Sequence, residues 1–328
     1  LTGDGRAMAY RLGVELRAMD SFERHVGIKN FIRGGQGTWI GVYRYPDGKP
    51  IGKYVNKPDR DHGDITPEAD KCVFARIIEQ GRGPVYMDCR GISDEDLDFL
   101  LHWLRQEGNE ALVDYLGKEG IDLQKNPVEF ITYHYMVREG IWINTKAETN
   151  IPGLYAAGDE VTRSISPAAV FGWIAGKSAS DFIAGKKANS VKTEKGRASK
   201  DRLEGMLSRK TGFDWKDANF ALQQVMTDYL GTVRSHDYLS AGLSHLRRLK
   251  RQVSENLIAA DGWELARCLE VINLYDLGEM MFLSALERKE SRGLIQRVDY
   301  PYADPLLHDR DLFVRKTNRE FRAVWRSS

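Results

Sequence analysis

The sequence has few cysteines and no long hydrophobic run. Its 328 residues include three cysteines, Cys72, Cys89 and Cys268, and no CxxC pair. An odd number without paired spacing argues against a disulfide framework and against an iron–sulfur or zinc site. No stretch approaches the roughly 18 consecutive apolar residues that a membrane-spanning helix needs. We therefore expect no metal site, no direct membrane insertion and a reducing, cytoplasmic location.

The sequence also lacks an excess of charge of one sign. Lys and Arg number 48 and Asp and Glu number 47, for a formal net charge of +1. No overall field would attract nucleic acid or an anionic membrane, so partners must be recognised locally. The length exceeds one typical domain of roughly 100–200 residues, which predicts two or three packed units. Residues 1–5 lack an initiator Met and resemble the inside of a working loop, so we expect a truncated or processed chain.

Apolar periodicity predicts mostly helical structure after residue 160. Residues 5–19 have helical spacing, and residues 140–144 and 153–159 read as strands. A Lys-rich, Ser-rich segment at residues 187–200 is typical of a solvated linker. The remaining predicted helices are 68–79, 94–116 with Ser93 as its cap, 167–184, 217–230, 238–256 and 263–289, and the last three predict a helical bundle.

Two glycine-containing turns could carry chemistry. Gly3, Asp4 and Gly5 precede a predicted helix, where backbone N–H groups could approach a phosphate or an electron-rich ring. Gly158 and Asp159 follow an apolar strand, where the carboxylate could accept a ribose or ribityl hydroxyl, or could cap the next helix. Each motif alone is equally compatible with an ordinary turn.

The joint order of several motifs resembles the fumarate reductase, succinate dehydrogenase and adenylylsulfate reductase flavoprotein superfamily. TGDG at residues 2–5 matches the TGDG stretch of that family, and PGLYAAGD at residues 152–159 closely resembles its PGLYAAGE element. RGPVYMD at residues 82–88 is similar to the capping-domain stretch. ESRG at residues 290–293 and DYP at residues 299–301 resemble the element after the helical domain.

This resemblance implies an α/β plus α architecture with FAD as the cofactor. We expect part of a Rossmann-like FAD-binding domain, an inserted α+β capping domain and a C-terminal helical bundle. The N-terminal half of the FAD domain, with its GxGxxG turn, has no counterpart here and would be supplied separately. The expected divisions are 1–20 and 134–186 for the FAD domain, 21–133 for the capping domain, 187–200 for the linker, 201–290 for the helices and 291–328 for a polar, turn-rich tail.

The family's activity is hydride exchange between flavin N5 and a small anionic, dicarboxylate-like substrate, with electrons passed to or from an iron–sulfur or other partner subunit. Through such a partner the protein could associate with a membrane. His25 and His134 stand at the family's histidine positions. An adenylylsulfate-reductase-like flavoprotein, favoured by the stretch Gly140 to Trp142, is one alternative. A non-catalytic electron-transfer or assembly subunit is the other.

The two substrate arginines of the family do not transfer directly. Lys71 stands near one position, while the loop of the other is shortened, so Arg138 and Arg163 are the nearest replacements. Ser166, Pro167 and Ala168 would open a helix beneath the flavin, where free N–H groups favour negative charge at N1 and O2. The resemblance thus implies catalytic candidates His25, His134, Arg138, Arg163 and Lys71, and cofactor-binding candidates Thr2, Gly3, Asp4, Gly158, Asp159, Ser166 and Ala168.

Overall fold

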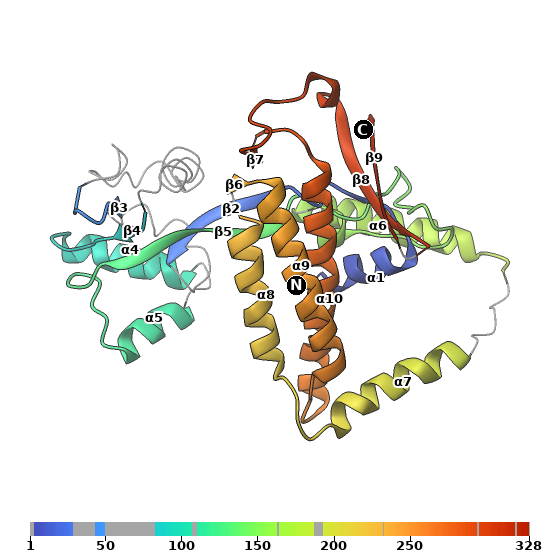
Figure 1. Ribbon diagram of the computed structural model, residues 1–328, viewed down its shortest axis with the longest axis horizontal. Helices are drawn as coiled ribbons and strands as arrows, with labels where there is room; N and C mark the ends of the chain where they lie inside the picture. The colour runs from blue at the N-terminus through green and yellow to red at the C-terminus, as the bar shows by residue number, and fades with distance from the viewer. Residues whose placement is uncertain are drawn as a thin grey trace. The chain divides into compact units, whose positions relative to one another are not determined.

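The chain forms two compact units, unit 1 with residues Leu1–Ser21 and Val137–Ser328 and unit 2 with residues Phe22–Met136. The computed structural model in Figure 1 describes residues 3–28, 43–49, 83–106, 110–162, 164–186, 193–231, 233–293, 295–318 and 320–327. The predicted helix over residues 68–79 lies outside these residues.

The described residues of unit 2 form a sheet and two helices. The strand order is β2-β5-β4-β3, and β3, β4 and β5 pair antiparallel. Leu100 and Leu104 of one helix and Leu112 and Leu116 of the other are buried in the shared core, because residues four apart lie on one helix face. The elements are β2 (Phe22–Ile28), β3 (Tyr43–Arg44), β4 (Val85–Met87), α4 (Asp94–Gln106), α5 (Glu110–Lys118) and β5 (Val128–Val137).

The predicted helix over residues 94–116 corresponds to α4 and α5, with residues 107–109 outside the described part. Its predicted cap is confirmed, since the Asp96 backbone N–H donates to Ser93 Oγ at 3.1 Å. Three acidic residues, Asp94, Glu95 and Asp96, lie in the first turn of α4. They favour this end of the helix because its dipole is positive there.

A helical bundle makes up much of unit 1 and confirms the periodicity prediction. Side-chain caps begin each helix: Asp214 accepts from Lys216 N, Ser235 from Tyr238 N and Asp261 from Glu264 N. The helices α8 (Trp215–Tyr229), α9 (His236–Asn256) and α10 (Gly262–Glu287) pack against one another (Figure 1). Among the described residues, no helix combines the length and hydrophobicity that crossing a bilayer requires.

Two predictions for the C-terminal half are wrong. The expected linker at residues 187–200 is helical from Thr193, where α7 (Thr193–Ser208) begins. The expected polar, turn-rich tail contains a β-hairpin in which Leu312, Phe313 and Val314 are buried. That hairpin consists of β8 (Arg310–Thr317) and β9 (Glu320–Ser327), and it forms a three-stranded sheet with β1 (Leu16–Arg17).

A second small sheet pairs β6 (Val233–Arg234) in parallel with β7 (Gln296–Arg297). The short helix η5 (Pro305–Leu307) lies between β7 and β8 in the sequence.

The first helix is shorter than predicted. Helix α1 (Asp4–Leu12) ends at Gly13, whose φ of 86° is left-handed and whose N–H bonds to the carbonyls of Ala9 and Tyr10. Glycine adopts this conformation without a steric penalty, so it stops the helix. Leu16, expected on the same helix, instead pairs with Val314 of β8.

The two predicted strands before α6 are also wrong. Residues 140–144 and 153–159 make isolated bridges, Leu16 with Ile141 and Glu148 with Tyr155. The second segment ends in the short helix η4 (Gly158–Glu160). Helix α6 (Ile165–Ile183) follows and confirms the prediction for residues 167–184 to within two residues.

Candidate functional site

The candidate site lies where the first turn of α1 meets η4. The Glu160 carboxylate accepts hydrogen bonds from the backbone N–H groups of Gly5 at 3.2 Å and Arg6 at 2.9 Å. Helix η4 also contacts α6. Four predicted cofactor residues, Gly3, Asp4, Gly158 and Asp159, therefore flank one long-range contact.

The Glu160 side chain occupies the N-terminus of α1, where the sequence predicted that backbone N–H groups could approach a phosphate. Its carboxylate lies 3.7 Å from Arg6 Nε, and the Arg6 guanidinium also donates to the carbonyl of Asp159. Burial lowers the pKa of Arg6, against the opposing effects of Glu160 and Asp159. Gly140 packs against this group so closely that a Cβ would overlap the Glu160 carbonyl oxygen. The first amides of α1 thus serve the protein's own packing.

Gly3 and Asp4 are fixed by helix α10. Gly3 has a left-handed φ of 71°, and a Cβ there would lie 2.6 Å from Leu277 Cδ1. The Asp4 carboxylate accepts from Asn273 Nδ2 at 2.5 Å. These two residues hold the start of α1 against the bundle, so a cofactor would meet their backbone rather than their side chains.

Gly158 and Asp159 are open to a ligand. Gly158 has a φ of 72°, and a Cβ built there would meet no atom within 4 Å. Asp159 is exposed, and its carboxylate accepts no hydrogen bond among the described residues. A glycine backbone without a neighbour beside a solvated carboxylate can admit a polar chain with hydroxyl groups.

Helix α6 begins two residues earlier than predicted, after Ser164. Ser164 has a φ of 119°, which is uncommon for a residue with a side chain. The Ala168 N–H already bonds to the Ser164 carbonyl at 3.2 Å. Because Pro167 has no N–H, the helix-end amides of Ile165 and Ser166 remain to meet negative charge, whereas that of Ala168 does not.

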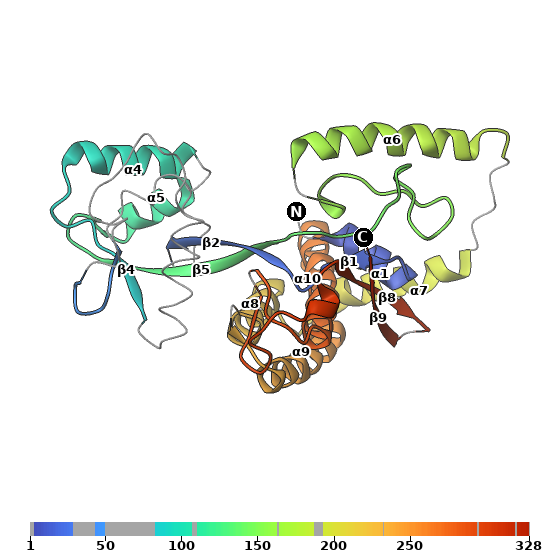
Figure 2. The ribbon, with the colours of Figure 1, turned by 90° about the horizontal axis from the view of Figure 1, so that it is seen from above.

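An apolar face of α6 is uncovered in the described residues. Ile165 is 89% exposed, Val170 55% and Trp173 77%, and the helix has no buried residue. Figure 2 shows the green segment that leads into α6 lying along the helix, and Tyr155 of that segment stacks edge-on against Phe182 at 6.3 Å. Large apolar side chains gathered on one exposed face mark a contact surface.

The other predicted residues are only partly described. For His25 in β2 and His134 in β5 the backbone alone is described. Arg138 follows β5 with an exposed side chain, and its backbone N–H donates to the Ser21 carbonyl at 3.0 Å. Thr2, Lys71 and Arg163 lie outside the described residues. Their roles, and those of the two histidines, stay predictions.

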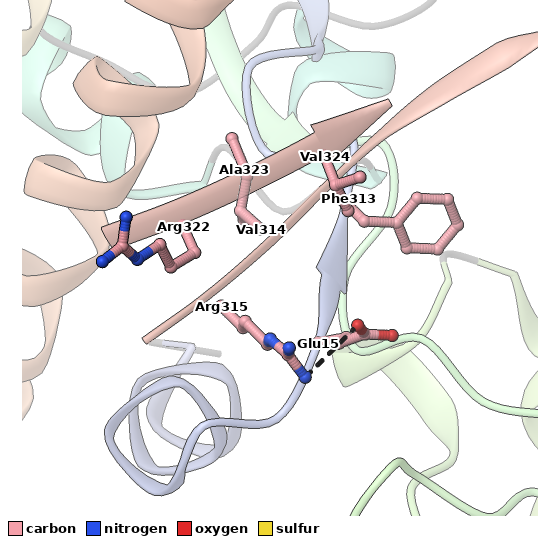
Figure 3. A pocket seen from close by; sticks show the side chains of 7 residues that line it. All are labelled: Glu15, Phe313, Val314, Arg315, Arg322, Ala323 and Val324. Carbon is pink, nitrogen blue, oxygen red and sulfur yellow. Dashed lines mark ion pairs between the residues drawn. The ribbon is translucent and has the colours of Figure 1, made fainter. Parts of the chain in front are cut away.

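A separate hollow of about 100 Å³ opens on the face of β8 and β9 (Figure 3). Its wall pairs Glu15 with Arg315 at 3.8 Å, and Arg326 reaches the same carboxylate at 2.6 Å. None of the predicted site residues lines it; the lining residues are Glu15, Phe313, Val314, Arg315, Arg322, Ala323 and Val324.

Sequence reasoning missed Glu160, Arg6 and Gly140. The one signal was the presence of two adjacent carboxylates, Asp159 and Glu160, after Gly158. In the structure Glu160 caps α1 and Asp159 is exposed. The partner of Glu160 is more than 150 residues away along the chain, so no local pattern indicates it.

Two protein families match different parts of this chain. Residues 1–170 match the FAD binding domain family, and residues 219–321 match the fumarate reductase flavoprotein C-terminal family. The first match alone takes in more than half of the chain.

Curated relatives are similar along 92% of this chain. An uncharacterised FAD-dependent oxidoreductase of Methanocaldococcus jannaschii is 29% identical over 325 residues, and 56% of its length is covered. The fumarate reductase flavoprotein subunit of Mycobacterium tuberculosis is 27% identical with 58% covered, and L-aspartate oxidase of Acinetobacter baylyi is 26% identical with 55% covered. The chain therefore spans little more than half the length of these relatives.

Solved structures confirm the fold. Quinol fumarate reductase of E. coli matches 99% of this chain and 61% of its own, with a TM-score of 0.75 at 21% identity. Adenylylsulfate reductase of Archaeoglobus fulgidus matches the same shares, with a TM-score of 0.70 at 18% identity. The chain therefore belongs to the FAD binding domain family and carries the fumarate reductase flavoprotein C-terminal domain, with an α/β plus α fold and FAD as its cofactor.

Proposed function

We propose that this chain is the larger part of an FAD-dependent oxidoreductase that acts on a small anionic, dicarboxylate-like substrate. The observation that carries the proposal is the open Gly158 backbone and solvated Asp159 carboxylate beside the start of α6, in a chain of this family. When bound, FAD supplies hydride exchange at flavin N5. The chain's own residues bind the cofactor, orient the substrate and move protons.

The residues present fit one part of FAD. The Asp159 carboxylate would accept hydrogen bonds from hydroxyls of the ribityl chain, and the open space at Gly158, where an added Cβ meets no atom within 4 Å, would leave room for that chain. The amides of Ile165 and Ser166 would stabilise negative charge near flavin N1 and O2, because the N-terminal end of a helix carries partial positive charge. These groups would hold the ribityl and flavin portion of FAD.

The remaining part of the FAD site would come from residues outside this sequence. The exposed apolar face of α6 supports this, as do Met8 at 55% and Leu12 at 65% exposure on α1. Curated relatives are longer by more than two fifths of their length. We propose that a nucleotide-binding half packs on this face and buries it.

Substrate binding is assigned to His25 and His134, with positive charge from Arg138, Arg163 or Lys71. A guanidinium forms a two-point contact with a carboxylate, and a histidine can donate to it and transfer a proton. Strands β2 and β5, which carry the two histidines, belong to the same sheet.

An electron-transfer partner, such as an iron–sulfur subunit, follows from the cysteines. Cys89 and Cys268 are buried in different units, and burial raises their pKa values to about 12 and about 11. Such thiols stay protonated and are poor metal ligands at neutral pH. The described residues contain no group of side chains that could hold a metal ion, and we propose that single electrons pass through another protein, which could also hold this one at a membrane.

The second candidate, an adenylylsulfate-reductase-like activity, loses some support from packing. Gly140 fits against Glu160, and the Trp142 ring lies edge-on to Phe313 at 6.2 Å. The stretch from Gly140 to Trp142, which suggested the adenylylsulfate reductase branch, is therefore also explained by packing.

One experiment separates the candidates. The full-length protein is purified, its flavin absorbance is recorded, and bleaching or reoxidation is followed with fumarate, succinate, aspartate, and sulfite with AMP. Response to a dicarboxylate supports the proposal, and response to sulfite with AMP supports the second candidate. A flavin that responds to none indicates a non-catalytic subunit, and a protein without flavin refutes all three.

A further inference from the structure

A buried charge cluster holds the place where the chain leaves unit 1 for unit 2. The chain departs after Ser21 and returns at Val137. The Arg138 N–H donates to the Ser21 carbonyl at 3.0 Å, and the Ser21 N–H donates to the Ala18 carbonyl at 3.1 Å. One backbone hydrogen bond thus ties the outgoing and returning segments together, next to Asp20.

Asp20 is held at two of its atoms by arginines from distant segments. Its carboxylate is fully buried and accepts from Arg288 Nε at 2.5 Å. Its carbonyl accepts from Arg234 at 2.9 Å. The second carboxylate oxygen of Asp20 has no partner among the described residues. Its side chain is therefore fixed through the contact with Arg288.

Arg288 is itself fixed from the other side. It ends α10 as the C-cap residue, donates to Glu290 Oε1 at 2.8 Å and lies 4.6 Å from the centre of the Trp325 ring. Glu290 is fully buried and also accepts from Arg292 and from the Asp304 N–H. The guanidinium is thus clamped between two buried carboxylates and an aromatic ring.

Such a cluster fixes the orientation of its side chains more than it stabilises the folded protein. Replacing a buried ion pair with apolar side chains is often neutral for stability, while removing one partner leaves an unpaired buried charge. A planar guanidinium between two carboxylates fixes the angle of both. Asp20 lies two residues before Phe22, the first residue of β2.

We propose that Asp20 and Arg288 are positioning residues for substrate binding: their buried ion pair fixes the point from which the strands carrying His25 and His134 leave unit 1. The inference rests on the proposed function, in which those histidines bind the substrate. A shift of one residue in a strand turns every side chain to the other face, so the anchoring of both strands matters.

The test uses full-length, flavin-loaded protein with Asp20→Asn, Arg288→Met and Arg288→Lys. The matched control is Glu320→Gln, which removes a surface ion pair of 2.6 Å whose side chains are both 65% exposed. Steady-state kinetics are measured with whichever of fumarate, succinate or aspartate the wild type turns over. Flavin content, flavin absorbance and amide hydrogen exchange in residues 18–22 and 137–139 are recorded alongside.

We expect KM to rise on the order of tenfold or more in Asp20→Asn and Arg288→Met, and less in Arg288→Lys. Amide exchange at the two segments should rise, while flavin content, absorbance and the control stay at wild-type values. If Asp20→Asn or Arg288→Met does not fold, the KM of Arg288→Lys is compared with that of wild type instead. A KM within twofold of wild type, even with faster exchange, overturns the inference and leaves the proposed function intact. A wild type that turns over none of the acids overturns both.

Discussion

The Glu160 carboxylate lies 2.9 Å from the backbone nitrogen of Arg6, in the first turn of α1. This contact separates two adjacent acidic residues by role. Glu160 caps a helix that begins near the start of the described chain, while Asp159 faces solvent beside Gly158.

Substitution Glu160→Ala should destabilise the full-length protein by about 1–3 kcal/mol. The change removes the acceptor for two helix N–H groups and leaves the buried Arg6 guanidinium without its carboxylate. Urea denaturation at pH 7 measures the effect. Glu320→Ala, at an exposed position, should stay within about 0.5 kcal/mol of wild type; equal effects would contradict the capping role.

Substitution Asp159→Ala should weaken FAD binding without a change in stability. Losing hydrogen bonds to a charged acceptor costs about 1.5–3 kcal/mol, or roughly tenfold to a hundredfold in Kd. The Kd for FAD is measured by fluorescence titration of the full-length apoprotein with FAD. If Glu160→Ala lowers affinity more than Asp159→Ala, then Glu160 rather than Asp159 is the cofactor ligand.

Substitution Trp173→Ser tests whether the apolar face of α6 is covered in the full-length protein. Truncating a buried aromatic side chain costs about 3–5 kcal/mol, so a marked loss of stability is expected. Tyr302→Ser is the control, because Tyr302 is 83% exposed and Trp173 is 77% exposed in the described chain. Similar small effects in the two variants would show that the α6 face stays in water.

Acid should remove part of the stability of unit 1 through Asp299. Hydrogen bonds from Arg297 lower the Asp299 pKa to about 2. A pKa lowered by folding stabilises the protein above the unfolded value of about 3.9, and this contribution is lost as pH falls toward 2. In urea titrations Asp299→Asn should be less stable than wild type at pH 7, with the difference shrinking between pH 5 and 2. A constant difference would exclude this linkage.

Local patterns predicted the bundle well and the strands poorly. Helices α8, α9 and α10 carry strong periodicity and a capping side chain each. The apolar run at residues 140–144 looks like a strand, but Ile141 donates its N–H to the Glu160 carbonyl and makes an isolated bridge with Leu16. The hairpin β8–β9 was missed because its sheet partner β1 is short and almost a whole chain away.

The contacts at the candidate site join residues that are close in sequence and residues that are far apart. The family motif pointed to Gly158 and Asp159, because the residues of a motif are neighbours in the sequence. The capping contact of Glu160 and the anchoring of Asp20 by Arg288 join segments far apart in sequence. Such pairings depend on the assembled fold, and no periodicity or spacing encodes them.

The pairing of Leu16 with Val314 bears on how the protein is made. Unit 2 is a continuous stretch, Phe22–Met136, so its residues have all left the ribosome while β8 is still untranslated. Unit 1 cannot complete its three-stranded sheet until β8 and β9 emerge. Synthesis therefore gives unit 2 a head start in folding, while the side chain of Leu16 in β1 stays exposed to chaperones or to aggregation until its partner strand from the other end of the chain is made.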